Sequence, residues 1–160
     1  MTGITREQAA QAVAALFGTT ARQTRESRTY DPWEVIDNEG KKWRFVYDGS
    51  IHMTHRECRR QAVVHDSRYS VEMNSPKLEY SEMKKLQEVI RTLRHAGAVV
   101  NDSCGMHVHV DASNHTPRSL KNAMTIMYSK EDILFKALKV QTSREQEYCQ
   151  KVRPIVLEKI

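Results

Sequence analysis

The chain has 160 residues, of which 39% are hydrophobic and 28% are charged. This composition excludes a disordered segment and predicts one globular domain over residues 1–160. The formal net charge of +5 suits anionic ligands such as nucleotide phosphates and acidic peptides. No apolar run approaches the ~20 residues of a membrane span. Residues 1–8 also lack the apolar stretch of a secretion signal.

The three cysteines are odd in number and too widely spaced to form a Cys-x-x-Cys pair. They are Cys58, Cys104 and Cys149. This pattern is typical of reduced thiols in a reducing compartment. We therefore expect a cytoplasmic protein with no membrane partner.

Two amphipathic helices are expected in the first hundred residues. The first covers residues 6–17, where Thr5 and Gln8 form a capping-box pattern and Gly18 provides a stop signal. The second covers residues 81–96. Its apolar stripe consists of Met83, Leu86, Ile90 and Leu93.

Further helices are expected in the last third of the chain. Pro117 suits the first position of one helix. Ser129 resembles the N-cap of another helix that follows it, and a short helix is expected over residues 144–151, ended by Pro154.

Three stretches of alternating apolar and polar residues predict strands over residues 33–37, 42–48 and 69–74. The second strand ends at Asp48 in an Asp-Gly-Ser turn. Glu72 stands on the polar face of the third, so its carboxylate belongs to an ordered strand.

The alternation is strictest over residues 105–111, which predicts a fourth strand. Cys104, Met106, Val108 and Val110 point one way, whereas Gly105, His107, His109 and Asp111 point the other. The α-carbons of the two histidines would be roughly 6.5–7 Å apart at strand rise. Both imidazoles could then reach one metal ion or one polyphosphate. The alternative is an amphipathic strand whose two histidines only face water.

Together these elements predict an α+β fold, with a mainly antiparallel sheet and helices packed on one face.

Several of these motifs, taken in order, resemble the amidoligase family, whose members are related to glutamine synthetase and glutamate–cysteine ligase. They run from Trp43 through Asp48-Gly49-Ser50 and Glu72-Met73-Asn74-Ser75-Pro76, past the amphipathic helix, to Ala96-Gly97-Ala98-Val99-Val100-Asn101 and Cys104-Gly105-Met106-His107-Val108-His109-Val110. The run Gly105-Met106-His107-Val108-His109 also resembles the Gly-Met-His-x-His strand of glutamine synthetase.

The resemblance implies a curved antiparallel sheet whose polar face forms the active site of an ATP-dependent ligase. Such an enzyme joins a small-molecule or peptide carboxylate to an amine through an acyl phosphate. By resemblance, Glu72 and His107 would bind Mg²⁺ or Mn²⁺, and His109 would lie near the nucleotide phosphates. Asp48, with Ser50, would line the substrate end, and Asp48 and Glu72 would be the catalytic carboxylates.

The family pattern also includes a first strand with Gly-x-Glu-x-Glu and a later strand resembling Glu-Phe-Arg. Neither occurs in this sequence. We therefore expect a partial chain of a glutamine-synthetase-like domain, and expect the 160 residues alone to bind metal–ATP weakly and turn over little.

Two other classes of protein compete with the ligase. A metal-dependent hydrolase could use His107-x-His109, but the barrel fold of such enzymes needs repeated strand–helix units and about 250 residues. A non-catalytic module of the same scaffold could bind an anionic partner through the Arg56–Arg60 region. Nucleic acid is not the expected partner, because no aromatic residues interleave with those arginines.

Overall fold

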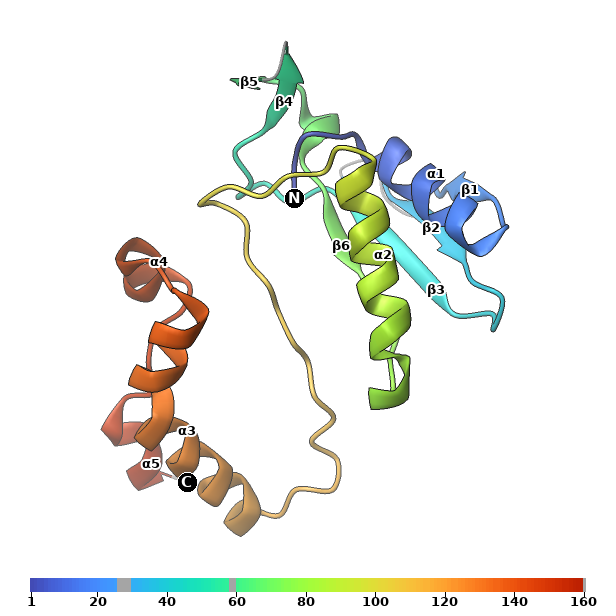
Figure 1. The fold of residues 1–160 in the computed structure, drawn as a ribbon. Coiled ribbons are helices and arrows are strands. Elements are labelled where there is room, and N and C mark those ends of the chain that lie inside the picture. Colours follow the sequence, from blue (N-terminus) through green and yellow to red (C-terminus); the bar gives the residue numbers. More distant parts are fainter. Residues whose placement is uncertain (26–29, 58–59, 160) are drawn as a thin grey trace. The chain divides into compact units, whose positions relative to one another are not determined.

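The computed structural model describes residues 1–25, 30–57 and 60–159. They form two compact units, Met1–Met106 and His107–Ile160 (Figure 1). The fold is α+β with an antiparallel sheet, as predicted, and the described residues form no closed barrel. The prediction of a single domain over residues 1–160 stays a prediction.

The first unit contains two antiparallel sheets. The larger has four strands in the order β1-β2-β3-β6, and the smaller pairs β4 with β5. The strands are β1 (Ala21–Gln23), β2 (Trp33–Ile36), β3 (Lys42–Val46), β4 (Thr54–Glu57), β5 (Arg60–Val63) and β6 (Glu72–Asn74). β2, β3 and β6 confirm three predicted strands, whereas β1 and the β4–β5 pair were not predicted.

Strand register gives the four-stranded sheet one apolar and one polar face. Residues that pair directly across an antiparallel sheet point to the same face. The apolar face pairs Val35 with Trp43, Trp33 with Phe45 and Phe45 with Met73, whereas the polar face pairs Arg22 with Glu34, Glu34 with Arg44, Arg44 with Asn74 and Val46 with Glu72. The sequence alternation therefore predicted the correct face for β2, β3 and β6.

Helix α1 (Arg6–Phe17) packs on the apolar face of the sheet. The predicted capping box between Thr5 and Gln8 is present, and Gly18 ends the helix in the left-handed conformation. Ala9, Ala10 and Val13 are fully buried in one hydrophobic cluster with Val35, Trp43 and Phe45. The small alanine side chains of the helix leave room for the large Trp43 and Phe45 side chains of the sheet. The interface between helix and sheet is therefore closely packed.

Helix α2 (Met83–His95) follows the short 3₁₀ helix η2 (Tyr80–Glu82) and contributes to the same core. Leu93 is buried and Leu86 is partly buried, as predicted. Ile90 was predicted to be in the stripe but is 40% exposed, and Val89 is buried in its place. The observed stripe therefore follows the i, i+3, i+7 spacing of residues 86, 89 and 93.

The second unit is helical, with α3 (Pro117–Leu138), α4 (Thr142–Glu147) and α5 (Pro154–Lys159). Thr116 caps α3, and Pro117 takes its first position. The predicted new helix after Ser129 is wrong, because α3 continues through this residue and the Ser129 hydroxyl donates to the carbonyl of Ile126. Pro154 begins α5, although we predicted that it would end a helix; proline fits the first helical turn well.

Two predicted strands need correction. Residues 67–69 form a 3₁₀ helix, η1, capped by Asp66, so the strand predicted over 69–74 is confined to β6. The strand predicted over residues 105–111 is absent, since no helix or strand is assigned there. Alternation indicates to which side each side chain of a strand would point. A strand forms only where its backbone hydrogen-bonds to a neighbouring strand. No described strand pairs with residues 105–111, and Met106, Val108 and Val110 are exposed.

Within the described ranges, no helix is both long enough and apolar enough to span a membrane. Cys104 and Cys149 carry free thiols, and Cys58 lies outside the described residues.

Candidate functional site

The Asp48-Gly49-Ser50 turn directly follows β3 and is fixed by its own hydrogen bonds. The Oδ1 atom of Asp48 accepts hydrogen bonds from the backbone N–H of Ser50 at 2.9 Å and from its hydroxyl at 2.7 Å. The backbone N–H of Asp48 donates to the hydroxyl of Ser70 at 3.1 Å. The two residues predicted to line the substrate end are therefore adjacent and ordered.

Ser70 links this turn to the rest of the first unit. It is fully buried, and its hydroxyl also donates to the carbonyl of Asp48 at 2.5 Å. Its carbonyl accepts a hydrogen bond of 2.9 Å from Arg6, whose guanidinium also pairs with Asp31 at 2.7 Å. A buried arginine with several acceptors is a rigid anchor. Arg6 of α1 therefore holds Ser70, which hydrogen-bonds to Asp48 and lies two residues before Glu72.

Glu72 lies on β6, which is an edge strand of the sheet. It pairs with Val46 on the polar face, and it follows Ser70 by two residues. Its side chain is exposed. Among the residues that the structure describes, nothing forms a hydrogen bond or ion pair with it. Glu72 is therefore an available oxygen ligand on the same unit as Asp48 and Ser50.

His107 and His109 belong to the second unit, at its N-terminal end. Both side chains are exposed in the segment without strands. The structure thus brings Asp48, Ser50 and Glu72 into one unit, and the sharing of one ligand by Glu72 and the two histidines stays a prediction.

The chemistry of these donors suits the predicted cations. A carboxylate is the ligand that Mg²⁺ prefers, and Mn²⁺ also accepts imidazole. No group of three or more His, Cys, Asp or Glu side chains suited to a metal ion occurs in the described part of the chain. Two protein ligands would leave most coordination positions to water and phosphate oxygens, as Mg²⁺ commonly requires.

A group of cations on the polar face was not predicted as a site. Glu34 is 1% exposed, and its carboxylate lies 3.3 Å from Arg22, 3.2 Å from Lys42 and 3.4 Å from Arg44. We call these four residues the Glu34 cluster. Because β1 was not predicted, the sequence offered no reason to place Arg22 beside Glu34.

A second charged cluster fixes the β2–β3 turn. Burial by itself raises the pKa of Asp37, but hydrogen bonds from the Lys41 backbone, the Trp43 indole and the Lys85 ammonium group outweigh it. The pKa of Asp37 therefore lies below its ordinary value. The ion pair between Lys85 and Asp37, at 3.3 Å, attaches this turn to α2. We assign this cluster to stability.

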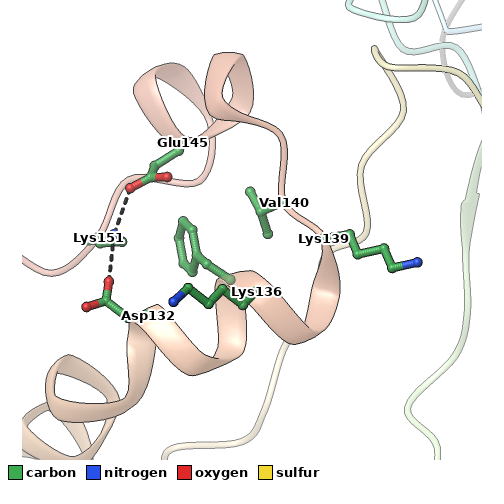
Figure 2. Close-up of a pocket in the computed structure, with 7 residues that line it drawn as sticks. Asp132, Lys136, Lys139, Val140, Glu145 and Lys151 are labelled. Carbon is green, nitrogen blue, oxygen red and sulfur yellow. Dashed lines mark ion pairs between the residues drawn. The ribbon is translucent and has the colours of Figure 1, made fainter.

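The second unit contains a pocket of about 280 Å³ (Figure 2). Its lining consists of Asp132, Phe135, Lys136, Lys139, Val140, Glu145 and Lys151. Lys151 lies between two carboxylates, at 2.8 Å from Asp132 and 2.8 Å from Glu145, and its pKa is raised by them. These pairs connect α3, α4 and the segment after α4. No predicted site residue lines the pocket.

Comparison with known families identifies the class. The described residues form an α+β fold with an antiparallel sheet, as the sequence predicted. The whole chain, residues 1–160, matches the sequence model of the family described as "Putative amidoligase enzyme", and the chain belongs to this family. Comparisons with curated proteins and with solved structures gave no match.

Proposed function

We propose that the protein is an ATP-dependent ligase that joins a carboxylate to an amine and passes through an acyl phosphate. Membership of the amidoligase family is the observation that carries this proposal. The available Glu72 carboxylate and the ordered Asp48-Gly49-Ser50 turn, on one unit, support it.

In the proposed reaction, an oxygen of the substrate carboxylate attacks the γ-phosphorus of ATP, and ADP leaves. The amine then attacks the acyl carbon, and inorganic phosphate leaves as the amide forms. Asp48 and Ser50 would orient the organic substrates, and the Asp48 carboxylate would accept a hydrogen bond or the proton of the attacking amine. His109 would donate hydrogen bonds to phosphate oxygens.

Glu72 and His107 would hold Mg²⁺ or Mn²⁺ in this proposal. The bound ion would neutralise phosphate charge during phosphoryl transfer. Glu72 suits this role because its carboxylate is exposed on an ordered strand and has no described partner. A glutamine-synthetase-like arrangement, with the polar sheet face as the active-site face, forms part of the proposal.

The reaction can be tested by the dependence of ATP consumption on both substrates. The complete protein should release phosphate only when a carboxylate and an amine are supplied together with Mg²⁺ or Mn²⁺, and mass spectrometry should detect the amide. Candidate substrates are pools of amino acids and short peptides. Phosphate release without any amide, across these pools, would contradict the ligase.

Ion binding can be tested separately from turnover. Electron paramagnetic resonance should show Mn²⁺ binding that weakens about tenfold or more in both Glu72→Gln and His107→Ala. The exposed His65, on the first unit, provides His65→Ala as a matched control. Unchanged Mn²⁺ affinity in both site variants would show that these residues are not ligands.

The non-catalytic module is the second candidate, and the Glu34 cluster favours it because three cations on one sheet face suit an anionic partner. The side chains of the Arg56–Arg60 region lie outside the part of the chain that the structure describes. Binding of ATP or an acidic peptide with no amide product under any substrate combination would favour the module over the ligase.

A further inference from the structure

We propose that Asn101 is a positioning residue of the ligase, which joins the loop of Asp48 and Ser50 to the segment that leads to His107. Asn101 would contact neither the substrates nor the ion, and would act through these two segments. Its role in the reaction rests on the proposed function, whereas the connection between the two segments does not.

Two loops of the first unit that are far apart in the sequence are joined by a closed set of hydrogen bonds. The Asn101 amide donates to the carbonyl of His52 at 2.7 Å, and the His52 backbone N–H donates to the Ser103 hydroxyl at 2.8 Å. The backbone N–H and the hydroxyl of Ser103 both donate to the Oδ1 atom of Asn101. We call these three residues the Asn101 network. Because its hydrogen bonds close into a ring, they support one another and hold the two loops together.

Each loop continues directly into residues of the proposed site. His52 follows Ser50 by two residues, so a displacement of His52 is transmitted to the turn of Asp48 and Ser50. On the other loop, His107 follows Ser103 by four residues, which span at most about 14 Å. The Asn101 network therefore constrains both the substrate end and the segment that leads to the proposed metal ligand.

The network requires the amide group of asparagine. Asn101 donates through Nδ2 and accepts through Oδ1, whereas an ionised carboxylate at this position would lack the donor. In Asn101→Asp, an oxygen atom would replace Nδ2 beside the His52 carbonyl oxygen, and the two oxygens would repel each other. The acceptor for the Ser103 backbone N–H would remain. This substitution thus removes the connection between the loops and keeps the turn over residues 101–103.

The location of the network favours positioning over stability. Both hydrogen bonds between the loops lie at the surface, and neither Asn101 nor Ser103 belongs to the buried hydrophobic cluster. A surface hydrogen bond contributes little to net stability, because water replaces it when it breaks. Loss of the network should therefore leave the fold intact and change how the two loops are held.

The connection can be tested by hydrogen exchange and mass spectrometry on the complete protein. In Asn101→Asp, the backbone amides of residues 49–53 should exchange at least about fivefold faster, because this loop opens more often. Asn101→Ala should show the same increase and keeps the test decisive if the first variant does not fold. Asn38→Asp is the matched control, since it makes the same charge change at an exposed position in the β2–β3 turn, at the opposite end of β3. Its exchange over residues 49–53 should be unchanged.

The role in the reaction can be tested with an amino-acid or peptide pair from which the complete protein forms an amide. Asn101→Asp should raise KM for the carboxylate and the amine and lower kcat/KM about tenfold or more, because small displacements of orienting groups are costly. Ser103→Ala should have a similar effect, and Ser103→Thr, which keeps the hydroxyl, should retain most of the activity. The unfolding temperature should stay that of the natural protein. A purely structural role would lower the unfolding temperature and leave KM unchanged.

Two outcomes would overturn the proposal. One is unchanged exchange of residues 49–53 in both Asn101 variants, and the other is faster exchange with unchanged kcat/KM. Failure of the ligase gives a different result. A natural protein that forms no amide would contradict the ligase and, with it, the role in the reaction, whereas faster exchange in Asn101→Asp would still support the connection between the loops. Amide formation with unchanged exchange would support the ligase and overturn the role of Asn101.

Discussion

Glu34 lies directly opposite Arg44 across β2 and β3, and its Oε1 atom is 3.4 Å from the Nε atom of Arg44. A carboxylate with 1% exposure thus pairs with cations that remain open to solvent. This relationship gives the polar face of the sheet a fixed carboxylate and a group of accessible positive charges.

Replacement of Glu34 by Gln should destabilise the first unit, because Arg22, Lys42 and Arg44 would repel one another without the carboxylate. The loss should be about 1–2 kcal/mol in low salt, below the cost of breaking a fully buried pair because the cations are partly solvated. Urea denaturation would measure it.

Two controls make this measurement specific. Glu88→Gln, at an exposed position on α2, should change stability by less than about 0.5 kcal/mol. Salt at 1 M should reduce the loss in Glu34→Gln, because it screens repulsion between exposed cations. A loss independent of salt would contradict the electrostatic explanation.

Asp37→Asn should lower the free energy of unfolding at neutral pH by about 1–3 kcal/mol, because Asn lacks the charge that several buried donors require. The pKa of Asp37 is lower in the folded than in the unfolded protein. Its stabilising contribution is therefore fully present above the unfolded pKa of about 3.9, and is lost as the pH falls through the folded pKa. Urea denaturation from pH 7 to pH 2 would measure this.

The natural protein and Asp37→Asn should thus converge in stability as the pH falls below about 4. Glu88→Gln should follow the natural protein at every pH, because Glu88 has no described partner in the folded state. A constant difference between Asp37→Asn and the natural protein down to pH 2 would show that the carboxylate charge is not responsible.

Gly3→Ala should destabilise the first unit by at least about 1–3 kcal/mol, because it combines backbone strain with a clash. Gly3 has a φ of +89°, and an added β-carbon would lie 2.7 Å from the carbonyl oxygen of Gly97. Thr2 pairs with Val99 at this point, so the backbone has little freedom to move. Thermal unfolding followed by circular dichroism would measure the effect.

Gly40→Ala is the matched control for this clash. Gly40 also has a positive φ, +79°, but no atom lies within 4 Å of its added β-carbon. Its loss should be about 1 kcal/mol, due to backbone conformation alone. Equal losses in the two variants would contradict the proposed clash.

The sequence predicted those parts of the fold in which local and tertiary preferences agree. The capping box at Thr5 and the alternation around Trp43 and Phe45 are local patterns, and the buried core uses the faces that they indicate. β1 was missed because its three residues are too few to show a period; β2 makes them a strand. Residues 105–111 show the opposite case, because their side chains alternate clearly but no described strand pairs with them.

The candidate site was predictable to a similar extent. Glu72 lies on a predicted strand and Asp48 in a predicted turn, because each position depends on one local element, and their roles in a site stay predictions. The Glu34 cluster depends on which strands are neighbours, and strand order is a tertiary property that a single sequence does not state. Ile90 illustrates the same limit within a helix, because α1 and the sheet decide which side of α2 is covered.

The last prediction concerns His107. In the complete enzyme, His107→Ala should lower metal-dependent amide formation by about 10²–10³, because it removes a preorganised electrostatic group from phosphoryl transfer. Folding should be unaffected, since the His107 side chain is exposed and lies outside the buried core. Phosphate release and mass-spectrometric detection of the amide measure activity, and circular dichroism verifies the fold. His65→Ala should keep full activity. Full activity in His107→Ala would show that the ion, and with it the reacting phosphate, is bound by other residues.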